Sequence, residues 1–311
     1  MSDNSDRPTE FEGEDLPTQA EGYEPPADDG VSTAPGRVID GYRLVRKVGE
    51  GGMGEVWEAE QFEPVRRTVA FKVIKRGMDS EQVVTRFAAE QQALAMMVHP
   101  SIARAYDAGT TPRGRPYFVM EHVPGVPLTH YCDKKGLDTV ERLELFIQIC
   151  EGVQHAHQKA IIHRDLKPSN VLIMEEDGKP LPKIIDFGVA KAMDQRLTDK
   201  TMYTEMGQLI GTPEYMSPEQ TDFSSEGIDT RSDVYALGVM LYELLVGTLP
   251  FESEELRAAG FDGIRKKIRE VDPPKPSTRV TSLGIDTGTF TRTHHVNRST
   301  LTRELKGDLD W

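Results

Sequence analysis

The chain has 311 residues and a formal net charge of −14, with 37% hydrophobic and 28% charged residues. A chain of this length can bury a core without disulfides. It has no apolar run long enough for a transmembrane helix and no apolar N-terminal signal segment. Its only cysteines, Cys132 and Cys150, exclude a disulfide framework and a four-cysteine metal site. We therefore expect a cytoplasmic protein made of one large domain or two lobes.

The negative charge is concentrated at the N-terminus. Residues 1–36 carry ten acids, one base and five prolines. We expect residues 1–38 to be a disordered acidic tail, because this segment offers little apolar surface to bury. The tail is either a solvating leader or a docking or autoinhibitory segment. Residues 37–311 hold 41 acids and 36 bases, which excludes a basic surface for nucleic acid.

The first part of the folded region has the pattern of a small β-rich lobe. Residues 80–98 have the apolar spacing of a helix, and Pro100 ends it. Five segments have the pattern of strands, namely 42–48, 54–60, 68–74, 102–108 and 116–121.

The rest of the chain is mainly helical in its pattern. Asp138 and Glu141 have the spacing of a capping box at a helix start. Residues 233–246 predict a strongly apolar helix that ends at Gly247, and residues 301–311 predict the start of another helix. Short strands are expected at 161–162, 171–173 and 183–185.

Residues 49–54 have the pattern G-x-G-x-x-G, which occurs in several kinds of phosphate-binding loop. A strand follows the glycines instead of a helix, so we expect them at a hairpin tip rather than in a dinucleotide-binding turn. Because glycine has no side chain, backbone N–H groups there can approach phosphate oxygens closely. Taken alone, the segment could also be a plain glycine-rich hairpin that binds no phosphate.

Lys72 lies inside the apolar strand predicted at 68–74, where an unpaired ammonium group is costly. Glu90 follows 18 residues later on the predicted helix and is the expected partner. An ion pair between them would aim the ammonium group at nucleotide phosphates. A surface lysine is the simpler interpretation of Lys72 by itself, but the glycine hairpin directly upstream favours the ion pair.

Residues 163–170, with the sequence H-R-D-L-K-P-S-N, carry the most specific pattern. Asp165 and Asn170 are five positions apart on one loop, so one can hold an attacking hydroxyl group while the other reaches a metal ion. Asp186 begins a D-F-G triplet behind a short predicted strand. A carboxylate in that position can hold Mg²⁺ that bridges nucleotide phosphates.

These motifs, in this order, resemble the signature of the protein kinase family. Residues 211–220, with the sequence G-T-P-E-Y-M-S-P-E-Q, make the chain most similar to bacterial eukaryotic-like Ser/Thr kinases. The resemblance implies an α+β, bilobal kinase fold within residues 39–311. It implies a β-rich N-lobe at about 42–122 and a larger helical C-lobe at about 123–311.

The resemblance implies transfer of the ATP γ-phosphoryl group to Ser or Thr hydroxyls of protein substrates, with ATP and Mg²⁺ as cofactors. In this scheme Asp165 orients the hydroxyl group and accepts its proton. Lys167 and Lys72 neutralise phosphate charge, and Asn170 and Asp186 hold Mg²⁺.

The family pattern also implies residues around the catalytic loop and the nucleotide. Lys167, two positions after the catalytic aspartate, together with Thr212, is typical of Ser/Thr kinases rather than tyrosine kinases. Asp233 is expected to anchor the backbone of the catalytic loop, and Met120 to face the adenine. The residues expected around the nucleotide are Val48, Gly49, Gly51, Gly52, Gly54, Val56, Ala70, Lys72, Glu90, Met120, Glu121 and Val123.

Phosphorylation of the activation loop is expected to switch the enzyme. A phosphate there would pair with Arg164 and order the loop. We expect the chain to add this phosphate by autophosphorylation, which self-association would allow to proceed in trans. The candidate acceptors are Thr198, Thr201, Tyr203 and Thr204, of which Thr204 and then Thr201 are favoured.

The resemblance also implies that Glu219 pairs with a buried arginine from a helix near the end of the C-lobe. The arginines after residue 246 lie in segments that do not match that helix. We therefore expect an incomplete C-lobe whose last helices are missing, with an unpartnered carboxylate and exposed apolar surface. A longer chain is expected to be more stable and more active.

The sequence has two alternative functions of other classes. A nucleotide-binding pseudokinase scaffold is disfavoured because the chain has all four of Lys72, Asp165, Asn170 and Asp186. A small-molecule phosphotransferase can share the catalytic-loop pattern but lacks the 33-residue interval from Asp186 to Glu219. A zinc site at His155 and His157 is disfavoured because no third ligand accompanies them, so a core or surface role is expected.

Overall fold

The computed structural model describes residues 33–51, 54–75, 96–187, 212–221, 228–282 and 297–310. The fold is that of the unit formed by residues 34–311, and most of the predicted tail lies outside the described residues. Within those ranges no helix is both long and apolar enough to cross a membrane. Neither cysteine is in a disulfide, and burial raises the pKa of both thiols to about 11.

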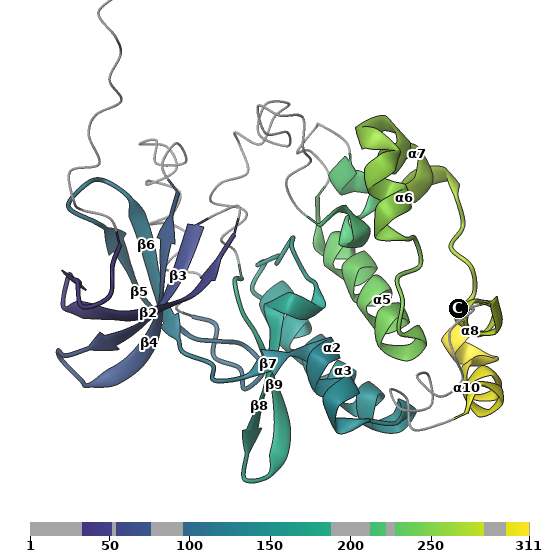
Figure 1. The fold of residues 1–311 in the computed structure, drawn as a ribbon, viewed down its shortest axis with the longest axis horizontal. Helices are drawn as coiled ribbons and strands as arrows, with labels where there is room; N and C mark the ends of the chain where they lie inside the picture. The colour runs from purple at the N-terminus through teal and green to yellow at the C-terminus, as the bar shows by residue number, and fades with distance from the viewer. Residues whose placement is uncertain are drawn as a thin grey trace, which may run out of the picture. The chain divides into compact units, whose positions relative to one another are not determined.

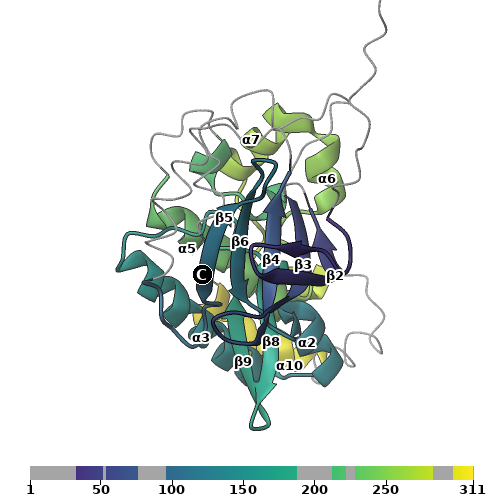
Figure 2. The same cartoon turned by 90° about the vertical axis from the view of Figure 1, so that its left-hand side faces the viewer.

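Six antiparallel strands form the first sheet, in the spatial order β1-β2-β3-β4-β6-β5. Five of them, β2 to β6, correspond to the predicted strands (Figure 2), and the strand order places the short β1 at the edge beside β2. The Gly51 amide donates to the Gly54 carbonyl at 2.9 Å, so the glycine segment joins β2 and β3 as the predicted hairpin. The strands are β1 (Val38–Ile39), β2 (Tyr42–Glu50), β3 (Gly54–Gln61), β4 (Arg67–Ile74), β5 (Ala105–Thr110) and β6 (Pro116–Glu121).

The strand register places the residues of this sheet on two faces, because neighbours across a ladder lie on the same face and successive residues alternate. Trp57 pairs with Phe71, and both lie in the buried apolar cluster of the sheet. Val56 pairs with Lys72 on the opposite face. The lysine therefore lies on the face away from this cluster.

The strand predicted at 102–108 is shorter than expected and begins at Ala105. Ile102 instead forms a parallel bridge with Ile184. The Ile184 amide donates to the Ser101 carbonyl at 2.8 Å. The Ile184 carbonyl accepts the Ala103 amide at 2.9 Å. The backbone around Ile102 is thus paired with a segment far away in the sequence and leaves the first sheet.

Two further local predictions need correction. The strand expected at 161–162 is absent, because the Ile161 amide donates to the Ala156 carbonyl and the His163 amide donates to a buried carboxylate. The helix expected at 80–98 lies mostly outside the described residues, but its last three positions, 96–98, are not helical.

Helices dominate the second part of the fold, and a small sheet of order β7-β8-β9 lies beside α2 and α3 (Figure 1). Its strands are β7 (Val126–Pro127), β8 (Val171–Glu176) and β9 (Lys179–Ile184). The helices are α2 (Leu128–Lys135), α3 (Thr139–His157), α5 (Thr230–Val246), α6 (Ser253–Ala258), α7 (Gly260–Glu270), α8 (Pro276–Ser282) and α10 (Arg298–Leu305). Short 3₁₀ turns cover Pro168–Asn170, Pro213–Tyr215, Pro218–Thr221 and Asp308–Asp310.

The ends of the two long helices follow from their sequences. Asp138 accepts the Glu141 amide, and the Glu141 side chain accepts the Asp138 amide, so the predicted capping box starts α3. Helix α5 begins three residues earlier than predicted because Asp229 caps it. It ends at Gly247, whose φ of 80° is a left-handed conformation that glycine adopts without a steric cost.

One buried apolar cluster connects the two parts of the fold. Leu145 of α3, Met240 of α5 and Ile184 of β9 are almost completely buried in it. Ile74, the last residue of β4, and Phe118, within β6, belong to the same cluster. The end of β9 is therefore fixed in a close-packed interior. Such an interior tolerates little displacement of the residues next to it.

Candidate active site

Asp233, in the first turn of α5, holds the start of the catalytic loop (residues 163–170), and its side chain is 1% exposed. Its Oδ2 accepts the His163 amide at 2.8 Å and lies 2.8 Å from His157 Nε2, while Oδ1 accepts the Arg164 amide at 2.8 Å. Burial by itself raises the pKa of this carboxyl, but the hydrogen bonds from His157 and the two amides outweigh burial and lower it. Asp233 is therefore an ionised anchor for the loop backbone.

The His163 ring connects the catalytic loop to the segment that follows β9. Its Nε2 lies 2.9 Å from the Ile185 carbonyl oxygen, which can only accept, so Nε2 carries the hydrogen. Its Nδ1 accepts the Asp165 amide at 3.3 Å. The ring packs edge-on against Phe187, with 4.6 Å between ring centroids. The position of Asp165 is thus coupled to that of the neighbouring D-F-G segment.

Asp165, Lys167 and Asn170 converge on one point of the loop. Lys167 Nζ lies 3.0 and 2.8 Å from the two carboxylate oxygens of Asp165, and 3.2 Å from the Thr212 hydroxyl oxygen. Asn170 Nδ2 donates to the Asp165 carbonyl at 2.8 Å and to its carboxylate at 3.1 Å. Because the amide nitrogen is used in this way, the amide oxygen is the atom that Asn170 offers to a cation. The Asp165 side chain is 38% exposed and open to a substrate.

Lys72 and Asp186 form an ion pair across the two parts of the fold, with 2.8 Å between Nζ and Oδ2. The Lys72 side chain is 6% exposed, so this partner compensates the cost of burying its charge. Asp186 has a φ of 64°, which a non-glycine residue adopts only where its surroundings impose it. The partner predicted for Lys72, Glu90, lies outside the described residues.

The residues present suit a divalent ion whose coordination is completed by phosphate oxygens. Among the described residues no group of three or more His, Cys, Asp or Glu side chains could hold a metal ion. Mg²⁺ does not need such a group, since one or two carboxylates, waters and substrate phosphates serve as its usual ligands. Asp186 offers a carboxylate and Asn170 an amide oxygen. The Ile185 amide donates to the Asn170 carbonyl at 2.9 Å and so links their two segments.

Most of the predicted nucleotide residues that are described lie on β2, β3, β4 and β6, whereas Gly51 and Val123 lie just beyond the ends of β2 and β6. A Cβ atom on Gly54 would lie 2.1 Å from a backbone carbonyl oxygen of β4, so only glycine fits there. Ala70 and Met120 pair across β4 and β6. The Glu121 amide already donates to a backbone carbonyl at 2.8 Å. Val48, Gly49, Gly51, Val56 and Val123 are also described, whereas Gly52, Glu90 and Thr198, Thr201, Tyr203 and Thr204 lie outside the described residues.

Residues 212–221 are attached to α5 by two side-chain contacts. The Ser232 hydroxyl donates to Glu219, and the Tyr215 hydroxyl donates to Glu243. Burial is the main cause that raises the pKa of both Tyr215 and Glu243. The arginine expected to be missing beside Glu219 stays a prediction.

Two long-range contacts, one of the catalytic loop and one of the Asp233 carboxylate that holds it, were not predicted from the sequence. Gln220 Nε2 donates to the Arg164 carbonyl at 2.7 Å, across 56 positions of sequence. His157, for which the sequence predicts only a core or surface role, contacts Asp233 across 76 positions. Neither contact has a local signal, because no spacing rule connects residues so far apart.

The model of the protein kinase domain matches residues 42–293. The chain belongs to the protein kinase family. It is 38% identical over 241 residues to the serine/threonine-protein kinase Pkn1 of Myxococcus xanthus, which covers 77% of this chain and 33% of that protein. It is 36% identical over 259 residues to PknB of Mycobacterium tuberculosis, which covers 82% of this chain and 39% of that protein. The chain thus spans a third to two-fifths of the length of these two relatives.

Solved kinase structures confirm the predicted α+β, bilobal fold. The kinase domain of Mycobacterium tuberculosis PknI matches with a TM-score of 0.59 and 22% identity, over 88% of this chain and 98% of that one. At this identity the likeness concerns the fold alone. Membership of the protein kinase family implies the use of ATP and a divalent metal ion.

Proposed function

We propose that this kinase-family chain is a Ser/Thr protein kinase that transfers the γ-phosphoryl group of ATP to hydroxyl groups of proteins. The observation that carries the proposal is the convergence of Lys167 and Asn170 on Asp165, in a loop held by Asp233. Phosphoryl transfer to a hydroxyl needs a positioned carboxylate beside a cation that neutralises phosphate charge, and this loop supplies both. The names of the two relatives, both serine/threonine-protein kinases, support the proposal.

Each residue of the site has a role in this proposal. Asp165 orients the substrate hydroxyl and accepts its proton, and Lys167 stabilises negative charge on the transferring group. Asn170 and Asp186 hold Mg²⁺, which when bound neutralises charge on the phosphate oxygens. Lys72 turns from Asp186 toward the nucleotide phosphates when ATP is present, because those oxygens carry more negative charge than one carboxylate.

The nucleotide is proposed to lie under the β2–β3 hairpin, on the sheet face that carries Val56 and Lys72. Val56 and Ala70 contact the adenine, and Met120 lies at its edge. Because the Glu121 amide is already used, backbone groups other than this amide, in residues 121–123, bind the adenine edge. The hydrogen bond of Lys167 to Thr212 joins residues 212–221 to the catalytic loop, which supports the proposed Ser/Thr specificity.

Lys72→Met should lower phosphoryl transfer at least about a hundredfold, the usual effect of losing one preorganised charge contact to a transition state. The substitution keeps the length of the side chain and removes its ammonium group. Transfer of labelled phosphate from ATP to a generic basic protein measures the effect. Lys306→Met changes an exposed lysine near the C-terminus. It is the matched control and should retain full activity. Normal turnover of Lys72→Met would show that the site is assigned wrongly.

Autophosphorylation of the activation loop is proposed as the switch, by self-association that presents one chain to another. The acceptors are Thr204 and then Thr201, and their phosphate pairs with the charge of Arg164 beside the catalytic aspartate.

Thr201→Ala/Thr204→Ala should lower activity about tenfold or more, since one charge-assisted hydrogen bond contributes about 1.5–3 kcal/mol. Mass-spectrometric mapping and initial rates measure this. The double variant Thr278→Ala/Thr281→Ala is the control, and full activity of the activation-loop variant would contradict the proposed switch.

A further inference from the structure

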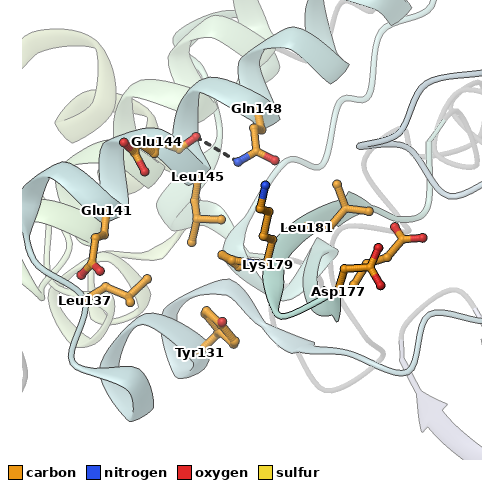
Figure 3. A pocket seen from close by; sticks show the side chains of 11 residues that line it. Tyr131, Leu137, Glu141, Glu144, Leu145, Gln148, Asp177, Lys179 and Leu181 are labelled. Atoms are coloured by element: carbon orange, nitrogen blue, oxygen red, sulfur yellow. Dashed lines mark hydrogen bonds between the residues drawn. The ribbon is translucent and has the colours of Figure 1, made fainter.

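A pocket of about 730 Å³ lies between α2, α3 and the β8–β9 hairpin, and none of its lining residues belongs to the catalytic or nucleotide site (Figure 3). Its floor is apolar. Tyr131 and Leu145 are buried there, and Leu137, Pro180 and Leu181 are partly buried. An apolar side chain that enters the pocket would therefore leave water for an apolar surface.

The rim of the pocket is acidic. Glu141 and Glu144 line it from α3, and Glu176 and Asp177 line it from the hairpin, with Lys179 as the one cationic side chain of the lining (Figure 3). The lining thus carries four carboxylates against one ammonium group. Carboxylates line the pocket on both sides, from α3 and from the hairpin. The rim therefore suits a ligand with more than one cationic group.

Three of the four carboxylates have no partner within the described part of the chain. Glu144, Glu176 and Asp177 are exposed, and their carboxylates form neither a hydrogen bond nor an ion pair there. Glu141 differs, because its Oε2 accepts the Asp138 amide at 2.9 Å as part of the capping box. These carboxylates are not neutralised by a neighbouring cation, so a cationic ligand that enters the pocket would gain direct electrostatic attraction to them.

Both walls of the pocket are preformed. Asp177 and Gly178, with φ of 50° and 75°, form the two-residue turn of the hairpin, and Glu176 pairs with Lys179 beside it. An Asp-Gly pair at positive φ is the favoured sequence for such a tight turn. The opposite wall is α3, whose Leu145 is 2% exposed and belongs to the main core. A ligand therefore binds without having to order either wall, which keeps the entropic cost of binding low.

We infer that this pocket docks an extended protein segment that has basic side chains on both sides of an apolar one. The apolar side chain occupies the floor formed by Leu145 and Leu181, and the basic side chains reach Glu144 and Glu176. The chain's own N-terminal tail does not suit the pocket, because residues 1–36 carry ten acids and one base. The site would bring substrates or regulators to the kinase without use of the catalytic cleft.

Fluorescence anisotropy of a labelled synthetic peptide with the whole 311-residue chain tests the inference. The probe carries two arginines on each side of a leucine pair, separated by glycine and serine. Two matched peptides replace the leucines with serine or the arginines with glutamate. We expect the first probe to bind more tightly than the serine peptide, no binding of the glutamate peptide, and weaker binding at high salt because exposed charges are screened.

Glu144→Lys/Glu176→Lys should weaken binding of the probe at least about tenfold, because it reverses charge on both walls. The control Glu60→Lys/Glu270→Lys makes the same change of net charge at exposed positions on β3 and α7, and should leave the affinity within about twofold. Leu181→Ser should weaken binding of the leucine probe and not of the serine peptide. Far-ultraviolet circular dichroism and melting temperature show whether each variant is folded.

Equal affinity of the Glu144→Lys/Glu176→Lys variant and the unsubstituted chain would overturn the inference, and so would an equal loss in the control. Complete displacement of the probe by Mg²⁺–ATP would place it in the catalytic cleft instead. Equal affinity of the leucine probe and the serine peptide would show a purely electrostatic surface. The Asp165→Asn chain should bind the probe unchanged, so a failure of the proposed kinase activity and a failure of the docking site give different results.

Discussion

Asp165→Asn should lower the rate of phosphoryl transfer by about 10²–10⁴-fold, the usual contribution of a positioned general base. The asparagine keeps the shape of the side chain and its backbone contacts. It loses the negative charge that Lys167 contacts through both oxygens, at 3.0 and 2.8 Å, and it cannot accept a proton from the hydroxyl. Binding of Mg²⁺–ATP should persist, because Lys72 and Asp186 are untouched.

Two measurements make this result specific. Initial rates with labelled ATP report transfer, and the rise in melting temperature on addition of Mg²⁺–ATP reports binding. Asp272→Asn, an exposed aspartate outside the site, is the matched control and should keep both properties. If Asp165→Asn transfers phosphate at a rate near that of the unsubstituted chain, Asp165 is not the base. If it no longer binds Mg²⁺–ATP, its role is in binding rather than proton transfer.

Asp233→Asn should destabilise the fold by about 3–5 kcal/mol, the usual effect of removing one partner from a buried, paired charge. Its carboxylate accepts the amides of His163 and Arg164 and contacts the His157 ring. An asparagine offers one oxygen and one N–H₂ group, so at least one of these donors would face another donor. For a domain of this size the melting temperature should fall by roughly 10 °C.

The effect of Asp233 on stability depends on pH in a defined direction. The pKa of this carboxyl is lower in the folded chain than its ordinary value of about 3.9. The stabilisation is therefore fully present above that ordinary value and is lost as pH falls through the lower pKa of the folded state. On the acid side of pH 4, the unsubstituted chain should lose stability more steeply than Asp233→Asn. Urea unfolding at several pH values measures the two slopes.

Asp229→Asn separates anchoring of the loop from capping of the helix. Asp229 caps the same helix, but its side chain is 47% exposed and contacts only nearby groups of Arg231. Asparagine is as good a helix cap as aspartate, so this variant should lose little stability. Equal loss in the two variants would mean that Asp233 acts through the helix terminus and not through the catalytic loop.

The sequence alone predicted the features that depend on neighbours in the chain. The glycine hairpin, the capping box of Asp138 and Glu141 and the glycine stop of α5 follow from local backbone preferences. The kinase fold was predicted by another route, the order and spacing of motifs such as residues 163–170. The roles of the individual site residues were inferred from the same resemblance and stay predictions until the variants are measured.

The tertiary structure decided the features that depend on partners far away in the sequence. Ile102 is not part of the predicted strand and forms a bridge with Ile184 instead. His157 contacts the Asp233 carboxylate, which anchors the catalytic loop. The acidic pocket likewise combines residues of α3 with a hairpin that begins after the catalytic loop. Local preferences are worth about 1 kcal/mol or less per residue. Burial and pairing across the core outweigh them, and only the folded chain shows which partners meet.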